Sequence, residues 1–408
     1  MKCGLLGGKL GHSYSPQIHS YLGNYSYALF EKSSEELEDF LKNGDFAGLN
    51  VTIPYKKAVI PHCAELSERA QKLGAVNTLV RRNDGTLIGH NTDFFGFETM
   101  LRSSGLHVAG RKVLILGSGG ASNTVAAVLR QQDADPVVIS RSGENHYGNL
   151  HLHADAAVII NTTPVGMYPN VSESPVDVAL FPALEGVLDL IYNPARTKLL
   201  LAAENRGLVV CNGLEMLVAQ AKESAEWFTG STIPDDVIPS IHRKLKNKME
   251  NIVLIGMPGC GKTAVGKLLA EITGKKFVDA DAYLIEKVGR NIPDIFAADG
   301  EVGFRALETE VLAELGKESG LIIATGGGCV TQTRNYPLLH QNGTIFWLQR
   351  ALSQLPVDGR PLSQTTNLAK MYEIRKPMYE RFADFTVDNN SDPTTTANAI
   401  FNILEGNQ

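Results

Sequence analysis

The sequence predicts an α/β protein of three units, with two lobes in the first 248 residues and a third unit in the remainder. Two glycine-rich turns each follow a short apolar strand pattern and open a helical pattern, which is typical of parallel sheets that bind phosphates. A basic stretch, residues 243–250, separates the second of these turns from the first. At 408 residues the chain is also too long for one core.

The second lobe begins near Gly110, where the chain enters the apolar strand pattern Val113–Leu116. A glycine turn, a helical run over Thr124–Arg130 and a second strand pattern, Pro136–Ile139, follow. Strand, helix and strand within about thirty residues predict a βαβ unit of a parallel sheet. Near the end of this half, one apolar stripe at helical spacing predicts an amphipathic helix. The stripe consists of Leu214, Leu217, Val218, Ala221, Ala225 and Phe228.

The third unit begins with the strand pattern Ile252–Ile255, directly after the basic stretch. Met249 stands where an independent protein could begin, which favours a fusion of two genes, although methionine is also common in helices. We therefore expect residues 1–97 and 214–245 to form the first lobe and residues 98–213 the second. We expect residues 246–250 to be a linker and residues 251–408 to be the third unit.

The composition is typical of a soluble globular protein, with 43% hydrophobic and 20% charged residues. The net charge of -6 argues against a general binder of nucleic acid or anionic membrane. The five scattered cysteines indicate reduced thiols rather than a disulfide framework or a zinc site. No apolar run is long enough for a signal peptide or a membrane span. We expect a cytoplasmic protein with no nucleic-acid or membrane partner, and a homo-oligomer stays open.

The most specific motif is the segment Gly256–Thr263, which follows one strand pattern and opens the next helix. Its glycines let backbone N–H groups surround phosphate oxygens, Lys262 would reach the β- and γ-phosphates, and Thr263 would ligate Mg²⁺. A chance match is the alternative, which the flanking strand and helix disfavour. The predicted ligand is Mg-ATP. The expected ATP contacts are Gly259, Cys260, Gly261, Lys262 and Thr263.

The other glycine turn, Gly117–Ser122, departs from the G-x-G-x-x-G pattern because Ser122 occupies the third glycine position. The next strand ends in Ser140, Arg141 and Ser142. An acidic residue there would favour NAD, whereas an arginine with flanking hydroxyls suits the 2′-phosphate of NADP. We therefore predict NADP(H). The expected contacts of this cofactor are Gly117, Gly119, Gly120, Ala121, Ser140, Arg141 and Ser142.

The first 248 residues resemble the shikimate dehydrogenase family at six motifs that occur in the family's order. These are Ser13–Pro16, Asn50–Lys56, Gly74–Thr78, Asn91–Asp93, the glycine turn at Gly117, and Asn212–Leu214 through Gln220. The resemblance implies a two-lobed fold with a Rossmann-like NADP lobe. It also implies reduction of the small molecule 3-dehydroshikimate to shikimate.

The same resemblance implies roles for individual residues. Lys56 would be the catalytic acid and base and Asp93 its partner, a pair that could protonate a developing alkoxide. Ser13 and Ser15 would hold the substrate carboxylate, and the other implied substrate contacts are Thr52, Asn77, Tyr192 and Gln220. Gly213 and Met216 would border the nicotinamide.

Each of these residues also has an ordinary structural explanation. Ser15 could be an N-cap before Pro16, and Asn77 could satisfy a turn. Lys56 could be a solvated loop lysine, and Met216 could pack between helices while Gly213 caps one of them.

Residues 251–408 resemble shikimate kinase, a P-loop phosphotransferase that converts shikimate to shikimate 3-phosphate. Besides the P-loop, the match rests on Phe277–Asp281, Phe304–Arg305 with Glu308, Gly326–Gly328, Arg360–Leu362 and Arg375–Tyr379. The resemblance implies that Asp279 joins the Mg²⁺ shell and that Asp281 orients or deprotonates the attacking hydroxyl. We expect both side chains to project from one face of a strand.

The kinase resemblance also implies the substrate contacts. Arg305 and Arg375 would clamp the shikimate carboxylate. Glu308 would hold Arg305 in place; the alternative is that Glu308 and Arg305 form a plain surface ion pair. Gly327 and Gly328 would approach the substrate closely, and the catalytic Arg360 would lie on a lid. The segment before Arg360 is short for such a lid, and we assign no arginine to the adenine.

Together these features predict a bifunctional enzyme of aromatic amino acid biosynthesis, both an NADP-dependent oxidoreductase and an ATP-dependent kinase. A dual quinate/shikimate dehydrogenase fused to the kinase is one alternative. A non-catalytic sensor of aromatic precursors is another, which the intact charged residues of both sites disfavour. A P-loop switch that acts on nucleic acid is disfavoured by the acidic balance of the chain.

Overall fold

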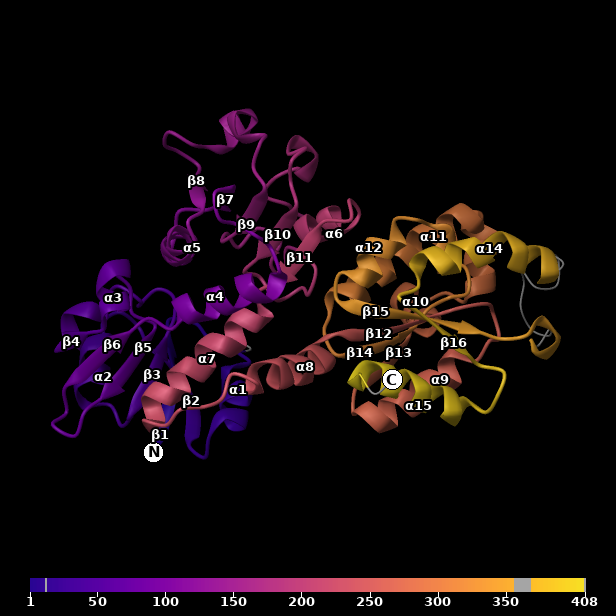
Figure 1. The fold of residues 1–408 in the computed structure, drawn as a ribbon. Coiled ribbons are helices and arrows are strands. Elements are labelled where there is room, and N and C mark those ends of the chain that lie inside the picture. Colours follow the sequence, from indigo (N-terminus) through magenta and orange to yellow (C-terminus); the bar gives the residue numbers. More distant parts are fainter. Residues whose placement is uncertain (12, 356–367, 407–408) are drawn as a thin grey trace. The chain divides into compact units, whose positions relative to one another are not determined.

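The computed structural model describes residues 1–11, 13–355 and 368–406 and contains three β-sheets (Figure 1). Its internal contacts divide the chain into two compact units. The first unit comprises Met1–Gly166, Glu173–Tyr192 and Ala202–His242, and the second comprises Met167–Ser172, Asn193–Leu201 and Arg243–Gln408. Two of the sheets lie in the first unit, and the third sheet lies in the second unit.

The first sheet is mixed, with its strands in the order β2-β1-β3-β5-β6-β4. Its strands are β1 (Lys2–Gly7), β2 (Ser26–Glu31), β3 (Gly48–Val51), β4 (Glu65–Leu66), β5 (Thr78–Arg81) and β6 (Leu87–His90). β1 is parallel to β3, and β5 is antiparallel to both β3 and β6. The carboxyl ends of β1, β3 and β6 therefore lie at the same edge as the amino end of β5.

Helices of the first lobe begin at this edge or pack on the sheet. They are α1 (Ser15–Leu22), α2 (Leu37–Asn43), α3 (Glu68–Leu73), α4 (Asp93–Ser104) and α7 (Leu214–Thr229), with a short 3-10 turn, η1 (Ile60–His62). α7 contains the apolar stripe predicted from the sequence, and it lies against α4 (Figure 1). The two helices approach closely at Gly96, where an added Cβ would lie 2.8 Å from the main-chain oxygen of Met216.

The second sheet is fully parallel, with its strands in the order β11-β10-β9-β7-β8. Its strands are β7 (Lys112–Leu116), β8 (Asp135–Ile139), β9 (Val158–Asn161), β10 (Gly186–Asp189) and β11 (Val209–Asn212). The connections include α5 (Gly120–Gln131), η2 (Tyr147–His153), η3 (Val178–Leu180) and α6 (Lys198–Glu204). The predicted βαβ unit is thus present as β7, α5 and β8.

The third sheet is also fully parallel, with its strands in the order β13-β14-β12-β15-β16. Its strands are β12 (Asn251–Ile255), β13 (Lys276–Asp279), β14 (Leu321–Ala324), β15 (Gly343–Gln349) and β16 (Phe385–Asp388). Its helices are α9 (Lys262–Thr273), α10 (Ala280–Val288), α11 (Ile292–Lys317), α12 (Asn335–His340), α14 (Leu368–Phe382) and α15 (Pro393–Glu405), with 3-10 turns η4 (Cys329–Thr331) and η5 (Leu352–Gln354).

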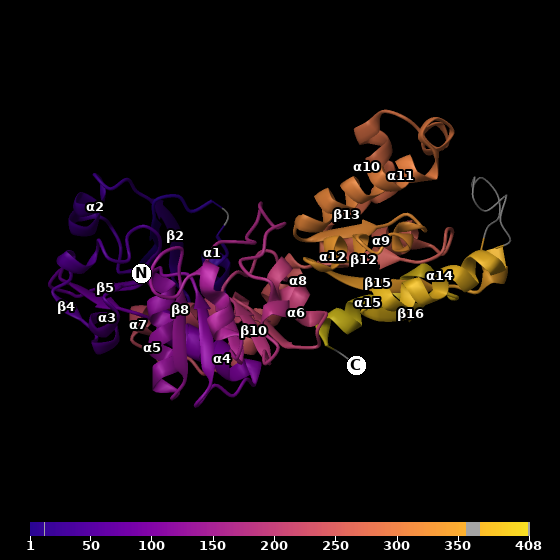
Figure 2. The same ribbon diagram turned by 90° about the horizontal axis from the view of Figure 1, so that it is seen from above.

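Helices cover both faces of the third sheet. α9 and α15 pack together on one face, and α11, α12 and α14 lie on the other (Figure 1). From above, α10 and the beginning of α11 project away from the strands (Figure 2). Gly300, with a φ of 66°, interrupts the first half of α11.

Two details differ from the sequence-based expectation. The basic stretch is helical, because α8 (Val237–Met249) runs through it and only Glu250 separates this helix from β12. The prediction that Asp281 shares a strand face with Asp279 is wrong, because β13 ends at Asp279 and Asp281 lies in the first turn of α10. Asp279 caps this helix by accepting hydrogen bonds from the backbone N–H groups of Asp281 and Ala282.

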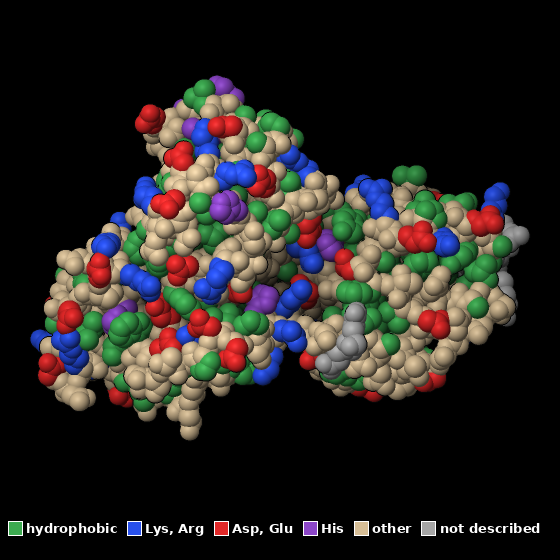
Figure 3. All heavy atoms as spheres, in the orientation of Figure 1, with side chains coloured by type: hydrophobic (Ala, Val, Ile, Leu, Met, Phe, Trp, Pro, Cys, Tyr) green, Lys and Arg blue, Asp and Glu red, His purple; other side chains and the backbone are tan. Residues whose placement is uncertain are grey.

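The surface and the helices carry two further observations. On the face shown in Figure 3, acidic and basic side chains are interspersed rather than separated into fields. Within the described part of the chain, no helix combines the length and the apolar character needed to cross a membrane.

Candidate active sites

Lys56 and Asp93 meet at the edge of the first sheet, although they stand 37 positions apart in the sequence. Lys56 lies in the turns after β3, and Asp93 is the first residue of α4. The Lys56 Nζ donates a hydrogen bond of 2.6 Å to Asp93 Oδ2. The helix N-terminus also stabilises the negative charge of Asp93. Lys56 is thus no free loop lysine but half of a partly buried ion pair, with its side chain 28% exposed.

Asn77, which directly precedes β5, binds the start of α4. Its Oδ1 accepts a hydrogen bond of 2.7 Å from the backbone N–H of Thr92, and its Nδ2 donates to Thr92 Oγ1 at 3.0 Å. Asn77 is 3% exposed, so these bonds are made away from solvent. Asn77 does more than satisfy a local turn, because it connects the amino end of β5 to the residue that precedes Asp93.

The other expected substrate contacts lie before and on α1, after β3, on α7 and, for Tyr192, after β10 of the second sheet. Ser15 is the first residue of α1 and not its cap, since the cap position belongs to Tyr14 and makes no side-chain hydrogen bond. Ser13 Oγ accepts a hydrogen bond of 3.2 Å from the backbone N–H of Ser15. The Tyr14 ring stands edge-on to Tyr192, with 6.3 Å between ring centroids, and burial raises the pKa of both phenols.

Thr52 and the expected residues of α7 complete this group. Thr52 follows β3 directly. Gly213 is the N-cap of α7, and Met216 packs against Gly96 of α4, so both have the structural roles that were the alternatives to cofactor contact. Gln220 lies one turn farther along α7, and its Nε2 donates to the main-chain oxygen of Leu217 at 2.8 Å.

The first glycine turn connects β7 to the N-terminus of α5, as a phosphate-binding loop does. A Cβ placed on Gly119 or Gly120 would meet no atom within 4 Å, so space for a ligand is open at the start of α5. β8 lies beside β7 and is parallel to it, so Ser140, Arg141 and Ser142 follow β8 at the edge that carries the turn. This arrangement of a helix N-terminus and an exposed arginine fits a nucleotide with a 2′-phosphate. Gly117 and Ala121 complete the expected cofactor contacts of this turn.

The P-loop of the third sheet curls between β12 and α9. Gly259 and Gly261 have φ angles of 83° and 100°, which only glycine adopts readily. Lys262 Nζ donates to the main-chain oxygens of Gly256 at 2.9 Å and Met257 at 3.2 Å, so the lysine folds over its own loop. Thr263 Oγ1 lies 2.9 Å from Asp279 Oδ2. Two hard oxygen donors side by side fit a Mg²⁺ shell completed by water and phosphate oxygens.

Asn389, which sequence reasoning missed, holds this loop from the end of β16. Its Nδ2 donates to the main-chain oxygen of Cys260, and its Oδ1 accepts from Thr396 Oγ1 at 2.6 Å. Asn389 is 1% exposed. No sequence motif marked it, because its partner stands 129 positions away.

Arg305 and Glu308 form a buried ion pair next to the P-loop edge of the third sheet. Arg305 Nη1 lies 2.7 Å from Glu308 Oε2, and the two residues are 4% and 2% exposed. Burial raises the pKa of Glu308, although the neighbouring Arg305 opposes this shift. The explanation of these residues as a plain surface pair is therefore wrong.

Both expected guanidinium groups meet the segment Gly326–Gly328. Arg375 Nη1 donates to the main-chain oxygen of Gly327 at 3.1 Å, and Tyr379 donates its hydroxyl proton to the same oxygen. A Cβ on Gly328 would lie 2.1 Å from Arg305 Nη2, so any larger residue there would displace the guanidinium group. Tyr379 was not assigned from the sequence, although its spacing of four from Arg375 places both on one helix face. Arg360 lies outside the described residues.

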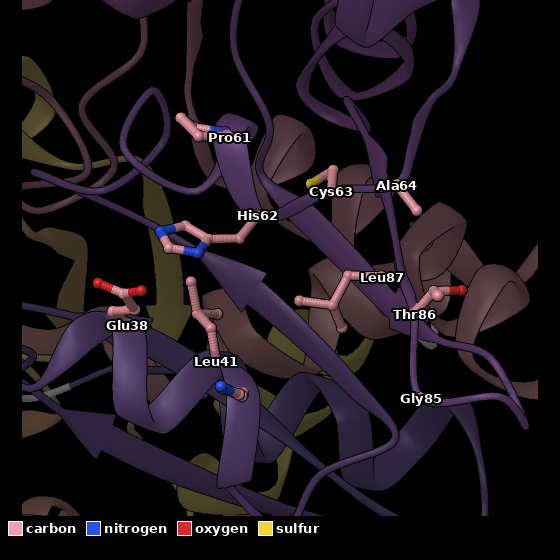
Figure 4. Close-up of a pocket in the computed structure, with 10 residues that line it drawn as sticks. Glu38, Leu41, Pro61, His62, Cys63, Ala64, Gly85, Thr86 and Leu87 are labelled. Atoms are coloured by element: carbon pink, nitrogen blue, oxygen red, sulfur yellow. The ribbon is translucent and has the colours of Figure 1, made fainter.

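One surface pocket of the first lobe, about 380 Å³, contains none of the residues expected to act (Figure 4). Glu38, His62, Cys63 and Thr86 are among its lining residues. Across the residues that the structure describes, no group of three histidine, cysteine or acidic side chains could hold a metal ion.

Comparisons with known proteins found relatives of both halves of the chain. Residues 5–79 match the shikimate dehydrogenase substrate binding domain, and residues 258–405 match the shikimate kinase family. A shikimate dehydrogenase (NADP(+)) of Clostridium perfringens is 34% identical over 265 residues, which cover 60% of this chain and 97% of that protein.

Solved structures resemble the same 60% of the chain. The shikimate 5-dehydrogenase of Thermus thermophilus, in complex with NADP(H) and shikimate, is 31% identical with a TM-score of 0.55 over 99% of its chain. The quinate dehydrogenase of Corynebacterium glutamicum, in complex with NAD, is 28% identical with a TM-score of 0.54 over 98% of its chain. The chain thus belongs to the shikimate dehydrogenase family over its first three fifths and continues into a shikimate kinase domain.

Proposed function

We propose that this chain reduces 3-dehydroshikimate to shikimate with NADPH and then phosphorylates shikimate to shikimate 3-phosphate with ATP. The ion pair of Lys56 and Asp93, 2.6 Å apart at the edge of the first sheet, carries the first half of this proposal. In this proposal residues 1–97 and 214–245 bind the substrate, residues 98–213 bind NADP(H), and residues 251–408 are the kinase.

Reduction of the ketone needs a hydride on the carbon and a proton on the oxygen. NADPH, when bound, supplies the hydride. The Lys56 ammonium group donates the proton to the developing alkoxide, and Asp93 holds the ammonium in place through their hydrogen bond. Ser13 and Ser15 hold the substrate carboxylate, while Thr52, Asn77 and Gln220 bind the ring oxygens and Tyr192 borders the ring.

The end of β8 selects the cofactor. Arg141 and the hydroxyls of Ser140 and Ser142 bind the 2′-phosphate, and Gly117–Ala121 with the N-terminus of α5 receive the pyrophosphate. Gly213 and Met216 are placed near the nicotinamide in this proposal, in addition to their packing roles.

Phosphorylation uses the side chains at the carboxyl edge of the third sheet. ATP with Mg²⁺, when bound, supplies the phosphoryl group. Thr263 and Asp279 hold the metal ion, and Lys262 neutralises phosphate charge. Asp281 orients the 3-hydroxyl of shikimate and takes its proton. Arg305 and Arg375 hold the shikimate carboxylate against the backbone of Gly327 and Gly328, and Glu308 fixes Arg305.

Two single substitutions test both halves in one assay with 3-dehydroshikimate, NADPH, ATP and magnesium. Lys56→Ala is expected to abolish NADPH oxidation while ADP release with added shikimate stays at the parent rate. Lys262→Ala is expected to do the reverse. Loss of both activities in either variant would show that the halves are not independent. A parent chain that turns over neither substrate but binds shikimate tightly would favour the sensor alternative.

Quinate is the second candidate substrate of the dehydrogenase half, because a quinate dehydrogenase shares its fold and 28% of its sequence. The arginine after β8 favours NADP, whereas that relative was solved with NAD. Steady-state kinetics with quinate and shikimate, each with NAD and NADP, distinguish a dual enzyme from a shikimate-specific one.

A further inference from the structure

A cluster of buried polar side chains lies beneath the dehydrogenase site. Ser224 of α7 stands at its centre, and Asn50, Thr78 and Thr92 come to it from β3, β5 and the N-cap of α4. Ser224 Oγ lies 2.7 Å from Asn50 Nδ2, 2.8 Å from Thr78 Oγ1 and 3.0 Å from Thr92 Oγ1. Ser224, Thr78 and Thr92 have no exposed surface, and Asn50 is 5% exposed. None of the three hydroxyl groups can therefore touch the substrate.

The donors and acceptors of this cluster are nearly all matched. Ser224 gives its only proton to the main-chain oxygen of Gln220 at 2.9 Å, so toward the cluster it acts as an acceptor. Its lone pairs take the Nδ2 proton of Asn50 and one threonine proton. Asn50 is fixed at its other end by Tyr27, whose hydroxyl donates to Asn50 Oδ1 at 2.8 Å.

The same cluster fixes the amide of Asn77. Thr78 Oγ1 lies 3.2 Å from Asn77 Oδ1, which also accepts a hydrogen bond from the backbone N–H of Thr92. Asn77 Nδ2 donates to Thr92 Oγ1. A flipped amide would place a donor against the Thr92 N–H, so the network allows one orientation of Asn77. The residue after Thr92 is Asp93, which holds Lys56.

We propose that Ser224 is a positioning residue of the dehydrogenase site. It holds α7 to β3, β5 and the start of α4 through hydrogen bonds that water cannot replace. It thereby sets the places of Gln220, Asn77 and the Lys56–Asp93 pair. This inference rests on the proposed function, because it concerns the same site.

Ser224→Ala removes the acceptor that Asn50 Nδ2 and the threonines share. Asn50 Nδ2 then keeps only its longer bond of 3.3 Å to Thr78 Oγ1, and the two threonine hydroxyls keep only their longer contacts with each other and with Asn77. We expect kcat/KM for 3-dehydroshikimate reduction to fall about 10- to 100-fold, because small displacements of reacting groups have effects of this size. We also expect the pH dependence of kcat to shift, since the environment of the Lys56–Asp93 pair changes. Kinase turnover in the same preparation stays at the parent rate.

Thr99→Val is the matched control. Thr99 lies on α4, is 4% exposed, and its Oγ1 has no hydrogen-bond partner among the residues that the structure describes. Removing this hydroxyl also changes a buried polar group, but it leaves the Ser224 cluster intact. We expect Thr99→Val to reduce 3-dehydroshikimate with the parent pH profile.

A double-mutant cycle with Thr78→Val separates positioning from simple loss of stability. In a connected network the double variant loses less activity than the product of the two single losses, whereas Thr99→Val combines additively with Ser224→Ala. Parent-like kinetics of Ser224→Ala would overturn the inference. So would a loss that only follows the unfolded fraction in a thermal melt, with an unchanged pH profile. If the parent chain itself reduces nothing, the proposed function fails instead.

Discussion

The buried pair of Arg305 and Glu308 makes a quantitative prediction for the stability of the second unit. Glu308→Gln keeps the volume of the side chain, so it creates no cavity, but it removes the negative charge beside a guanidinium that is 4% exposed. Loss of one partner from a buried ion pair typically costs about 3–5 kcal/mol because the other charge stays buried.

Two features of this pair lower the expected cost. Glu301 Oε1 lies 3.3 Å from Arg305 Nη2 and still compensates part of the charge. Glu308 Oε1 has no hydrogen-bond partner within the described chain, so the intact pair already contains one unsatisfied atom. We therefore expect Glu308→Gln to lower the free energy of unfolding of this unit by about 2–3 kcal/mol.

The two tryptophans allow this unit to be followed alone. Trp347 lies on β15 of the second unit and Trp227 on α7 of the first, so Trp227→Phe leaves a fluorophore only in the kinase half. Urea unfolding in that background measures the effect. Glu301→Gln is the control, because its side chain is 57% exposed and such pairs contribute less than about 1 kcal/mol.

A Glu308→Gln variant that destabilises the kinase half no more than Glu301→Gln does would show that the buried ion pair does not stabilise this unit. The kinetic counterpart is a raised KM for shikimate in Glu308→Gln, since Arg305 loses its fixed position. NADPH oxidation by the same protein is expected to stay unchanged, which shows that the first unit is still folded.

Three further predictions concern cofactors and pH. Arg141→Ala should raise the KM for NADPH at least about tenfold with little change for NADH, because a charge-assisted hydrogen bond contributes about 1.5–3 kcal/mol; equal effects on both cofactors would contradict this. Thr263→Val should raise the Mg²⁺ concentration needed for half-maximal ADP release, while reduction needs no added Mg²⁺ in either protein. Burial lowers the pKa of His90 to about 4 in the folded state. As the pH falls, the imidazole is therefore protonated in the unfolded state before it is protonated in the folded state. The first unit should therefore lose stability as pH falls from about 6.5 toward 4, by up to about 1.4 kcal/mol per pH unit for this group. Urea unfolding followed by Trp227, which stacks on His90, measures the slope in a Trp347→Phe background. Because Glu223, with a pKa raised to about 7, has the opposite pH dependence, the slope is compared with that of His90→Phe, and equal slopes would exclude the effect.

The sequence predicted the sheets where apolar runs and glycine turns coincide. β7, α5 and β8, and likewise β12 and α9, follow from local pattern alone, because buried parallel strands and phosphate loops have distinctive residues. Asp281 was misplaced because an Asp-x-Asp sequence fits both an extending strand and an N-cap. In the structure, Asp279 accepts hydrogen bonds from the backbone N–H groups of two residues that follow it, which shows that it is an N-cap. The sequence does not reveal these hydrogen bonds.

Contacts between residues far apart in the sequence could not be predicted from local patterns. The sequence alone gives no distance between Lys56 and Asp93, and their pairing was expected only from the family resemblance. Asn50, Thr78, Thr92 and Ser224 carry no shared pattern, and the mixed pairing of β3, β5 and β6 brings the first three together. Likewise, the spacing of Arg305 and Glu308 predicts contact between them but says nothing about burial.

The hold of Asn389 on the P-loop has a consequence for how the protein is made. Residues near position 260 leave the ribosome long before Asn389 and Thr396 do. The carbonyl of Cys260 is nevertheless held by Asn389, which is itself held by Thr396. A nascent chain would therefore complete its dehydrogenase half while its kinase loop still lacks a support. The P-loop would therefore reach its final geometry only after the segment that contains Asn389 and Thr396 has been synthesised and has folded against it.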